Sequence, residues 1–257
     1  MQTSQSLDSL PCEFSSLKNV PKEIFYRGKL SLLTKIKVSI VGARKAYPYS
    51  RSITHNLALE LSKRGVVVVS GGAMGIDAIS HNASFPNTIG VLANGLDIVY
   101  PKVNKNLLHK MSESSLLLSE YEDGEKARAY TFVHRNRLVV SLGEVLVIAQ
   151  ADIDSGSMRS AEFALEMGKK IYVLPHRLGE STGTTQLLKD GNAELITDIK
   201  EFADMFAPKI VEIEDDFLNF CINSPTYEEA ISFNAAKLFE YELLGKIKII
   251  NSRVSIT

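Results

Sequence analysis

The chain has 257 residues, of which 45% are hydrophobic and 23% charged, as expected for a globular protein with a sizeable buried core. A formal net charge of -1 excludes a protein that is basic over its whole surface, so any nucleic-acid-binding surface has to be local. The two cysteines lack metal-ligand spacing, no apolar run reaches the ~20 residues that span a bilayer, and the first residues do not resemble a signal peptide, so we expect a cytoplasmic protein without a metal site.

In chain order, residues 1–30 contain Pro11 and Pro21 and are predicted to form an irregular N-terminal segment. Short apolar runs then alternate with stretches of helical spacing. The predicted strands are KVSIVGA, VVVVSGG, TIGVLANG, SLLLSEY, EVLVIAQ and KIYVLP, and the predicted helices are SRSITHNLALELSKRG, residues 75–83, NKNLLHKMSES and MRSAEFALEMGKK. Nearly continuous apolar strands separated by helices predict a mostly parallel, doubly wound sheet, an extended Rossmann-like α/β domain over residues 31–205.

The end of the chain differs in composition. Residues 206–216 form an acidic stretch that we interpret as a linker, and residues 217–257 are predicted to form a small second domain. Residues 224–226 indicate a helix start, and KIKIINSRVSI can form a hairpin through residues 251–252. Two helices and a hairpin predict a winged-helix-like α+β domain. Its helices carry glutamates that would repel phosphates, so we expect a protein-contact or structural role: Glu228, Glu229, Glu240 and Glu242.

Ligands of open α/β sheets bind beyond the carboxyl ends of the strands, so the residues that follow each strand are candidate site residues. Gly71, Gly72 and Gly75 follow the second strand and precede a helix, where backbone N–H groups can bind an anion. The Ser155-Gly156-Ser157 turn repeats this arrangement, and Arg44 adds donors for a phosphate. Such glycines can also simply turn the chain, but three turns at one sheet edge favour a phosphate site. The spacing matches neither G-x-G-x-x-G nor a Walker loop, so we expect no nucleotide cofactor.

A cationic, aromatic segment, KARAYTFVHRNR, follows the fourth strand. Its cations and rings are Lys126, Arg128, Arg135 and Arg137, interleaved with Tyr130, Phe132 and His134. Single-stranded nucleic acids bind where cations follow the backbone and aromatic rings stack bases, at ~1–3 kcal/mol for each base. The same residues could form a solvated helix face with Phe132 in the core. Their position beside the glycine turns favours the phosphates of an unpaired polynucleotide.

Five motifs in series carry a resemblance to a known family: SIVGARKAYPYS, SGGAMGIDAISH, GVLANGLDIVYPKVN, FVHRNRLVVSLGEVLVIAQADIDSGSMRSAEFALEMGK and VLPHRLGESTGTTQLLKDGNAELI. Together they resemble the bacterial DNA-processing protein family DprA, also called Smf, from about residue 26 to about residue 196. The resemblance implies a Rossmann-like domain that binds single-stranded DNA, protects incoming DNA and promotes loading of the RecA recombinase in natural transformation. It also implies a homodimer that needs no cofactor and catalyses no reaction.

The residues that match the family's motifs predict a DNA site. Ala43 stands where the family has a hydroxyl residue, so the turn keeps its backbone and Arg44 without that side-chain hydrogen bond. The predicted DNA-binding residues are Gly42, Ala43, Arg44, Ser70, Gly71, Gly72, Gly75, Lys126, Arg128, Phe132, Arg135, Asn136, Arg137, Ser155, Gly156 and Ser157.

The main alternative is a nucleoside-monophosphate phosphoribohydrolase of the lysine-decarboxylase-like group, whose glycine turns are similar. That group would require P-G-G-x-G-T-x-x-E, where this chain has SGSMRSAE ending at Glu162. Asp77 and His81, four residues apart on a predicted helix, could form a general-base pair. A carboxylate in a first helical turn and a packed histidine explain them better, so we expect a binding protein with no catalytic residues.

Overall fold

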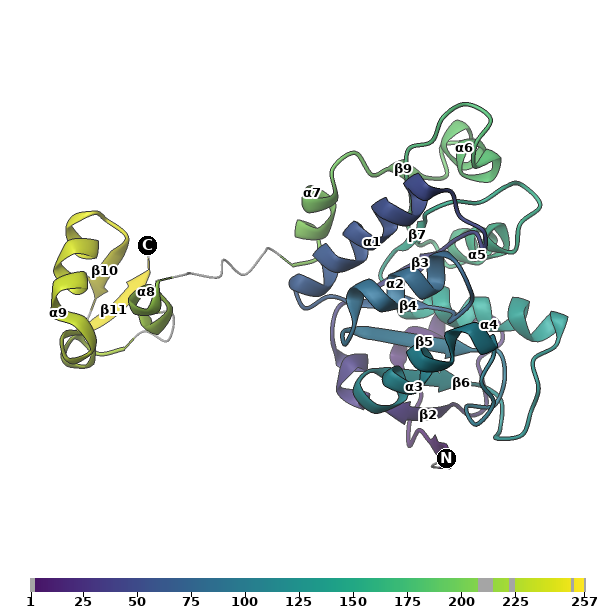
Figure 1. Ribbon diagram of the computed structural model, residues 1–257, viewed down its shortest axis with the longest axis horizontal. Helices are drawn as coiled ribbons and strands as arrows, with labels where there is room; N and C mark the ends of the chain where they lie inside the picture. The colour runs from purple at the N-terminus through teal and green to yellow at the C-terminus, as the bar shows by residue number, and fades with distance from the viewer. Residues whose placement is uncertain (1–2, 208–214, 222–224, 251, 257) are drawn as a thin grey trace. The chain divides into compact units, whose positions relative to one another are not determined.

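The computed structural model describes residues 3–207, 215–221, 225–250 and 252–256. The chain divides into two compact units, Met1–Lys209 and Ile210–Thr257, which are described separately (Figure 1). Three predictions fall partly outside the described residues: most of the predicted linker at 208–214, the predicted helix start at Ser224 and the hairpin turn at Asn251.

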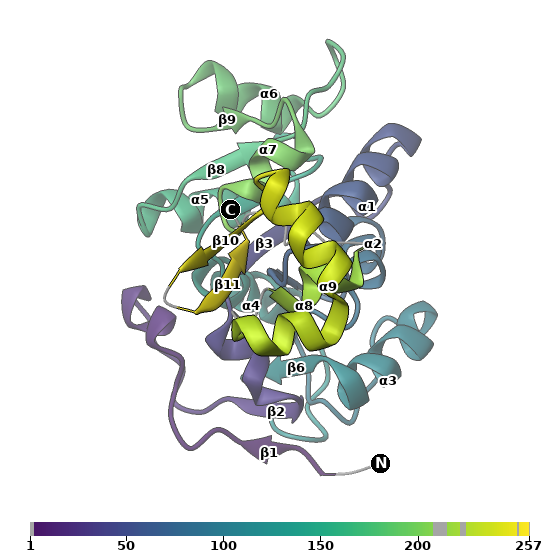
Figure 2. The same ribbon diagram turned by 90° about the vertical axis from the view of Figure 1, so that its left-hand side faces the viewer.

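The large unit is built on a nine-stranded sheet with the order β1-β2-β6-β5-β4-β3-β7-β8-β9. Strands β3 to β9 pair in parallel, whereas β2 is antiparallel to β6 and β1 is antiparallel to β2. Figure 2 shows this order from β1 and β2 at one edge to β8 and β9 at the other. The strand bounds are β1 Gln5–Ser6, β2 Phe25–Gly28, β3 Lys37–Val41, β4 Val67–Ser70, β5 Thr88–Leu92, β6 Leu116–Ser119, β7 Leu146–Ile148, β8 Ile171–Val173 and β9 Glu194–Leu195. The predicted Rossmann-like, mostly parallel sheet is confirmed.

Helices cover both faces of this sheet, as the separate apolar clusters on the two faces show. One face packs against α1 Pro48–Lys63, α2 Ile76–Ser84, α3 Lys105–Ser114 and α7 Ile199–Asp204. The other packs against α4 Ala129–Leu142, α5 Gly156–Glu166 and α6 Thr182–Lys189, together with the 3-10 turns η1 Cys12–Ser16 and η2 Leu30–Thr34. A further 3-10 turn, η3 Lys102–Asn104, precedes α3. Within these described elements, no helix is long and apolar enough to cross a bilayer.

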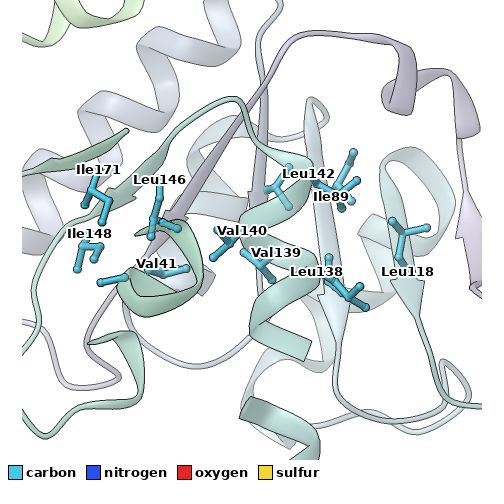
Figure 3. Packing of buried hydrophobic residues seen from close by; sticks show 14 of the residues in the cluster. Val41, Ile89, Leu118, Leu138, Val139, Val140, Leu142, Leu146, Ile148 and Ile171 are labelled. Atoms are coloured by element: carbon cyan, nitrogen blue, oxygen red, sulfur yellow. The ribbon is translucent and has the colours of Figure 1, made fainter. Parts of the chain in front are cut away.

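Helix α4 packs in the centre of the second face (Figure 3). Its buried side chains Leu138, Val139, Val140 and Leu142 belong to the same apolar cluster as residues of the six strands β3 to β8. The sequence pattern predicts no helix here, because the first half of α4 reads as a cationic segment and only its second half is apolar. The helix matters for function, since it begins at the sheet edge where the candidate site lies.

The predicted irregular segment, residues 1–30, contains short regular elements that the sequence pattern does not indicate, joined by irregular stretches at residues 7–11 and 17–24. Residues 25–28 form β2, which pairs with β6 in the register Tyr26 to Leu118. Phe14 and Ile24 are fully buried. The pairing of β2 with β6 depends on a strand far along the chain, so local sequence does not indicate it.

The described residues of the small unit form helices and an antiparallel strand pair: α8 Asp216–Cys221, α9 Tyr227–Leu243, which is kinked at Asn234, β10 Ile247–Ile250 and β11 Arg253–Ile256. Its core is formed around Phe217, Leu238 and Val254. A capping box of Thr226 and Glu229 begins α9, so this glutamate stabilises a helix start. The predicted small α+β domain is confirmed.

Candidate functional site at the carboxyl edge of the sheet

The turns after β3 and β4 meet at the carboxyl edge of the sheet. The Ile76 N–H donates to the Ala43 carbonyl at 3.2 Å, and the Ala43 N–H donates to the Gln150 carbonyl after β7 at 2.9 Å. Gly75 has φ +77°, and a Cβ there would lie 2.3 Å from the Ala43 carbonyl oxygen, so only glycine fits. A Cβ on Gly42 would lie 2.7 Å from the Ile76 side chain. The predicted glycine turn and arginine turn are therefore in direct contact.

Three side chains form hydrogen bonds with the backbone of the glycine turn (residues 71–75). The Asp77 carboxylate accepts the Ala73 N–H at 3.3 Å, and Asn104 Nδ2 donates to the carbonyls of Gly72 and Ala73, both at 3.0 Å. The Arg135 guanidinium donates to the carbonyls of Gly71 and Val91. Burial raises the pKa of Asp77, although the charge of Arg135 acts in the opposite direction.

These contacts leave part of the turn open to a ligand. Ser70 is buried, and its Oγ donates to the Ile40 carbonyl at 2.6 Å, so its hydroxyl supports the strand end. Among the described residues, no partner accepts the backbone N–H groups of Met74 and Gly75, which lie directly before α2. Such amides before a helix form an anion site.

A hollow of about 360 Å³, its open mouth included, lies beside the glycine turn. The Arg44 guanidinium lies 5.4 Å from the centroid of the Phe132 ring, and the Phe132 and Tyr100 rings are 5.5 Å apart. Arg44 is exposed and Phe132 is half-buried. The remaining lining comes from the turn and from the loop after β5: Gly71, Gly72, Ala73, Met74, Leu92, Ala93, Asn94 and Pro101. A cation, two rings and backbone amides thus surround one small cavity.

Two of the predicted cations are buried and need a corrected role. Arg135 is 5% exposed and lies on the core face of α4, one turn after Thr131. Arg137 is also 5% exposed, and its Nη2 donates to both oxygens of Glu120 at 2.7 and 2.8 Å. Both guanidinium groups are therefore turned into the fold: Arg135 holds the glycine turn, and Arg137 is paired with Glu120.

The remaining predicted residues lie around the start of α4 and of α5. Lys126 and Arg128 are exposed in the stretch that enters α4. Asn136 Nδ2 donates to the Gly156 carbonyl at 3.3 Å, which ties α4 to the third turn. Ser155 precedes α5, Gly156 is exposed and Ser157 is half-buried. All three predicted turns therefore contact α4: the arginine turn through Arg44 and Phe132, the glycine turn through Arg135, and the third turn through Asn136.

Asp77 and His81 do not form a solvent-facing pair. His81 is fully buried, and its Nδ1 lies 2.7 Å from Thr88 Oγ1. Thr88 Oγ1 already donates to the Val68 carbonyl, so it accepts from His81 Nδ1–H. Burial, with the nearby charge of Arg135, lowers the pKa of His81 to about 3. This neutral histidine belongs to the core.

The buried His81 makes stability depend on pH. The unfolded chain binds a proton here below about pH 6.5 but the folded chain does not, so stability is complete above pH 6.5 and is lost as the pH falls toward about 3. We expect the contribution to be about 1.4 kcal/mol for each pH unit. Urea unfolding of wild type, His81→Gln and the exposed-histidine control His55→Gln between pH 7 and 5 measures it. A steep acid loss that persists in His81→Gln would assign the effect elsewhere.

Comparison with known proteins adds family information. The model of the family described as DNA recombination-mediator protein A matches residues 3–207. The chain is 35% identical over 195 residues to the DNA processing protein DprA of Streptococcus pneumoniae, covering 74% of this chain and 68% of that protein. It is 35% identical over 187 residues to the Bacillus subtilis protein of the same name, covering 70% and 63%. The chain thus spans about two thirds of the length of these relatives.

Two solved structures are similar to the large unit. One is DNA processing protein A from Helicobacter pylori, whose structure was described for its single-stranded DNA binding mode. It superposes with a TM-score of 0.77 at 41% identity, covering 79% of this chain and 94% of that chain. The other is DprA from Streptococcus pneumoniae, with a TM-score of 0.75 at 34% identity, covering 80% and 75%.

Proposed function

The chain belongs to the DNA recombination-mediator protein A family, and on this premise we propose that the hollow beside the glycine turn binds single-stranded DNA. In this role the protein protects incoming DNA and promotes the loading of RecA during natural transformation. The Helicobacter pylori relative, which is described by its single-stranded DNA binding, supports this ligand class.

The observation that carries the proposal is the meeting of three kinds of group around one cavity. The open backbone amide of Met74 and the guanidinium of Arg44 line the hollow and can bind a phosphate, and the open amide of Gly75 is next to Met74 in the chain. The rings of Phe132 and Tyr100 can stack bases. Lys126 and Arg128, exposed where the chain enters α4, extend the positive charge.

The rings at the wall of the hollow favour unpaired strands. A base can stack on Phe132 or Tyr100 only if that base is turned away from a partner strand. A duplex keeps its bases stacked and paired inside the helix, and unstacking costs a few kcal/mol. We therefore expect duplex of equal length to compete poorly.

The geometry favours binding over hydrolysis. Asp77 is buried and accepts an N–H from the glycine turn, and His81 is bonded to Thr88 in the core. Glu162, the match to the acid of the phosphoribohydrolases, forms an exposed ion pair with Arg159 at 2.8 Å. These carboxylates and this imidazole have structural partners, which supports a protein that holds DNA without reacting with it.

The partners of the protein are part of the proposal. A RecA contact and a homodimer rest on family membership, and the exposed glutamates of α9 support a protein-contact role for the small unit: Glu228, Glu240 and Glu242. Cys12 and Cys221 are free thiols, which fits a reducing compartment such as the cytoplasm.

Phe132→Ala tests the stacking role. We expect weaker binding of labelled oligothymidylate by roughly 1–3 kcal/mol, with little dependence on base sequence, because a stacking ring accepts any base. Fluorescence anisotropy measures the affinity, and Phe132→Tyr is the matched control that keeps the ring. Unchanged affinity in Phe132→Ala would remove this ring from the site, and loss of the folded circular dichroism signal would place it in the core.

A further inference from the structure

A second hollow at the same sheet edge is not part of the site described above. It lies between the loop after β3 and the loop after β8 and has a volume of about 870 Å³ with its open mouth. Its lining residues are Tyr47, Pro48, Tyr49, Pro175, His176, Arg177 and Glu180. Tyr47 and Tyr49 are 45% and 44% exposed, so both rings are accessible to a ligand.

Both walls of this hollow are fixed to the end of β7. The Tyr47 N–H donates to Gln150 Oε1 at 2.9 Å, and His176 Nε2 donates to the Ala149 carbonyl at 2.9 Å. The Tyr49 ring packs edge-on against the His176 ring, with the centroids 6.0 Å apart. The Tyr47 backbone and the Tyr49 and His176 rings are therefore held in place before a ligand binds, which lowers the entropy cost of binding.

The topology favours a ligand at this point. In the sheet, β3 lies between β4 and β7, so the strand order reverses between β3 and β7. Open α/β sheets bind ligands in the crevice at such a switch point. The hollow beside the glycine turn lies over β4 and β5, whereas the second hollow lies at the switch point itself.

One short turn joins the two hollows. Arg44 lines the first and Tyr47 lines the second. Three residues of chain span at most about 10 Å. A polynucleotide whose phosphate lies on Arg44 can therefore reach the Tyr47 ring with its neighbouring nucleotides.

The chemistry of the lining selects the occupant. Tyrosine rings stack bases of any sequence, and the exposed Arg177 can attract the phosphate that joins such a base to the next. The Glu180 carboxylate repels a phosphate but can accept a hydrogen bond from a base N–H group. We propose that the second hollow holds an unpaired nucleobase of the same DNA strand that Arg44 binds, stacked on Tyr47 or Tyr49 with its phosphate toward Arg177. This inference rests on the proposed function.

A tryptophan reporter tests the occupancy of the second hollow. The chain has no tryptophan, so Tyr49→Trp supplies a single fluorophore at this site. We expect oligothymidylates to quench it, and quenching to begin only above the length that fills the first hollow. The control, Leu165→Trp, places the fluorophore in the last turn of α5, at the opposite edge of the sheet, where we expect no quenching. Equal response of both reporters at all lengths overturns the proposal.

Affinity measurements separate the two hollows. Tyr49→Ala is expected to weaken long oligothymidylates about tenfold while the shortest binding oligothymidylate is unaffected, and Tyr49→Phe to retain affinity. Arg44→Ala, in contrast, weakens every length. If Tyr49→Ala binds all lengths like wild type and Tyr49→Trp is not quenched, the second site is rejected while the proposed function stands. If wild type binds no oligonucleotide, both are rejected. Should Tyr49→Ala fail to fold, the Tyr49→Trp titration decides alone.

Discussion

Replacing Arg135 by alanine is expected to lower the free energy of unfolding by about 3–5 kcal/mol. The guanidinium is 5% exposed and donates to the carbonyls of Gly71 and Val91. Its removal leaves these buried carbonyls without a donor, and leaves the buried Asp77 without the positive charge that offsets its burial. The lost hydrogen bonds are those that fix the glycine turn, so the affinity for DNA should also decrease.

Urea unfolding followed by circular dichroism measures this loss. Arg159→Ala is the matched control, because that arginine is exposed and forms a surface ion pair with Glu162, whose removal should change stability little. Arg135→Lys should be intermediate, since an ammonium group keeps the charge but not the fork of donors. A decrease in Arg135→Ala no larger than that of the control would contradict the supporting role.

Arg44→Ala is expected to weaken single-stranded DNA of every sequence by about 1.5–3 kcal/mol, the typical contribution of a hydrogen bond to a charged group. Each phosphate contact with a single strand contributes about -0.7 to the slope of log affinity against log salt concentration, so the slope should flatten by about this amount. The fold should keep its stability, because the Arg44 side chain is exposed and its main contact is the Phe132 ring.

Anisotropy titrations at several salt concentrations measure both quantities. Lys63→Ala removes an equal charge from the last turn of α1, at the opposite edge of the sheet, and should change neither affinity nor slope. An unaltered salt slope in Arg44→Ala would mean that this guanidinium does not contact a phosphate.

Much of the fold can be predicted from the sequence, because its signals are local. The valine run that forms β4 and the apolar run that forms β5 are buried on both faces, as a parallel strand requires. Helix α4 could not be predicted in this way. Thr131, Arg135, Leu138 and Leu142 share its core face, with the spacing of one helical stripe. A stripe that contains an arginine does not read as apolar, whereas the cationic, aromatic segment and the family motif both predict a DNA contact for Arg135.

The candidate site, too, can be predicted from the sequence only where its signals are local. The glycine turn and Arg44 each follow a strand directly, so the sequence alone indicates them. Tyr100 and Asn104 were missed, because they come from the loop after β5, and only the folded chain brings them to the glycine turn. The signal was present in the stretch LDIVYPKVN, which follows a predicted strand at the same edge. Tyr47 and Tyr49 were overlooked for the same reason, as their hollow is completed by the loop after β8.

The glycine turn is held by side chains of three separate elements: Asp77 of α2, Asn104 of η3 and Arg135 of α4. Because the turn is already fixed in the free protein, it rearranges little when DNA binds. Most of the conformational entropy lost on binding is therefore lost by the polynucleotide. Flexible single strands with little base stacking are then the better ligands. A strand that has formed stacked or paired structure must first unfold before it binds. The affinity of the protein for DNA would then depend on the conformation of the strand more than on its base sequence.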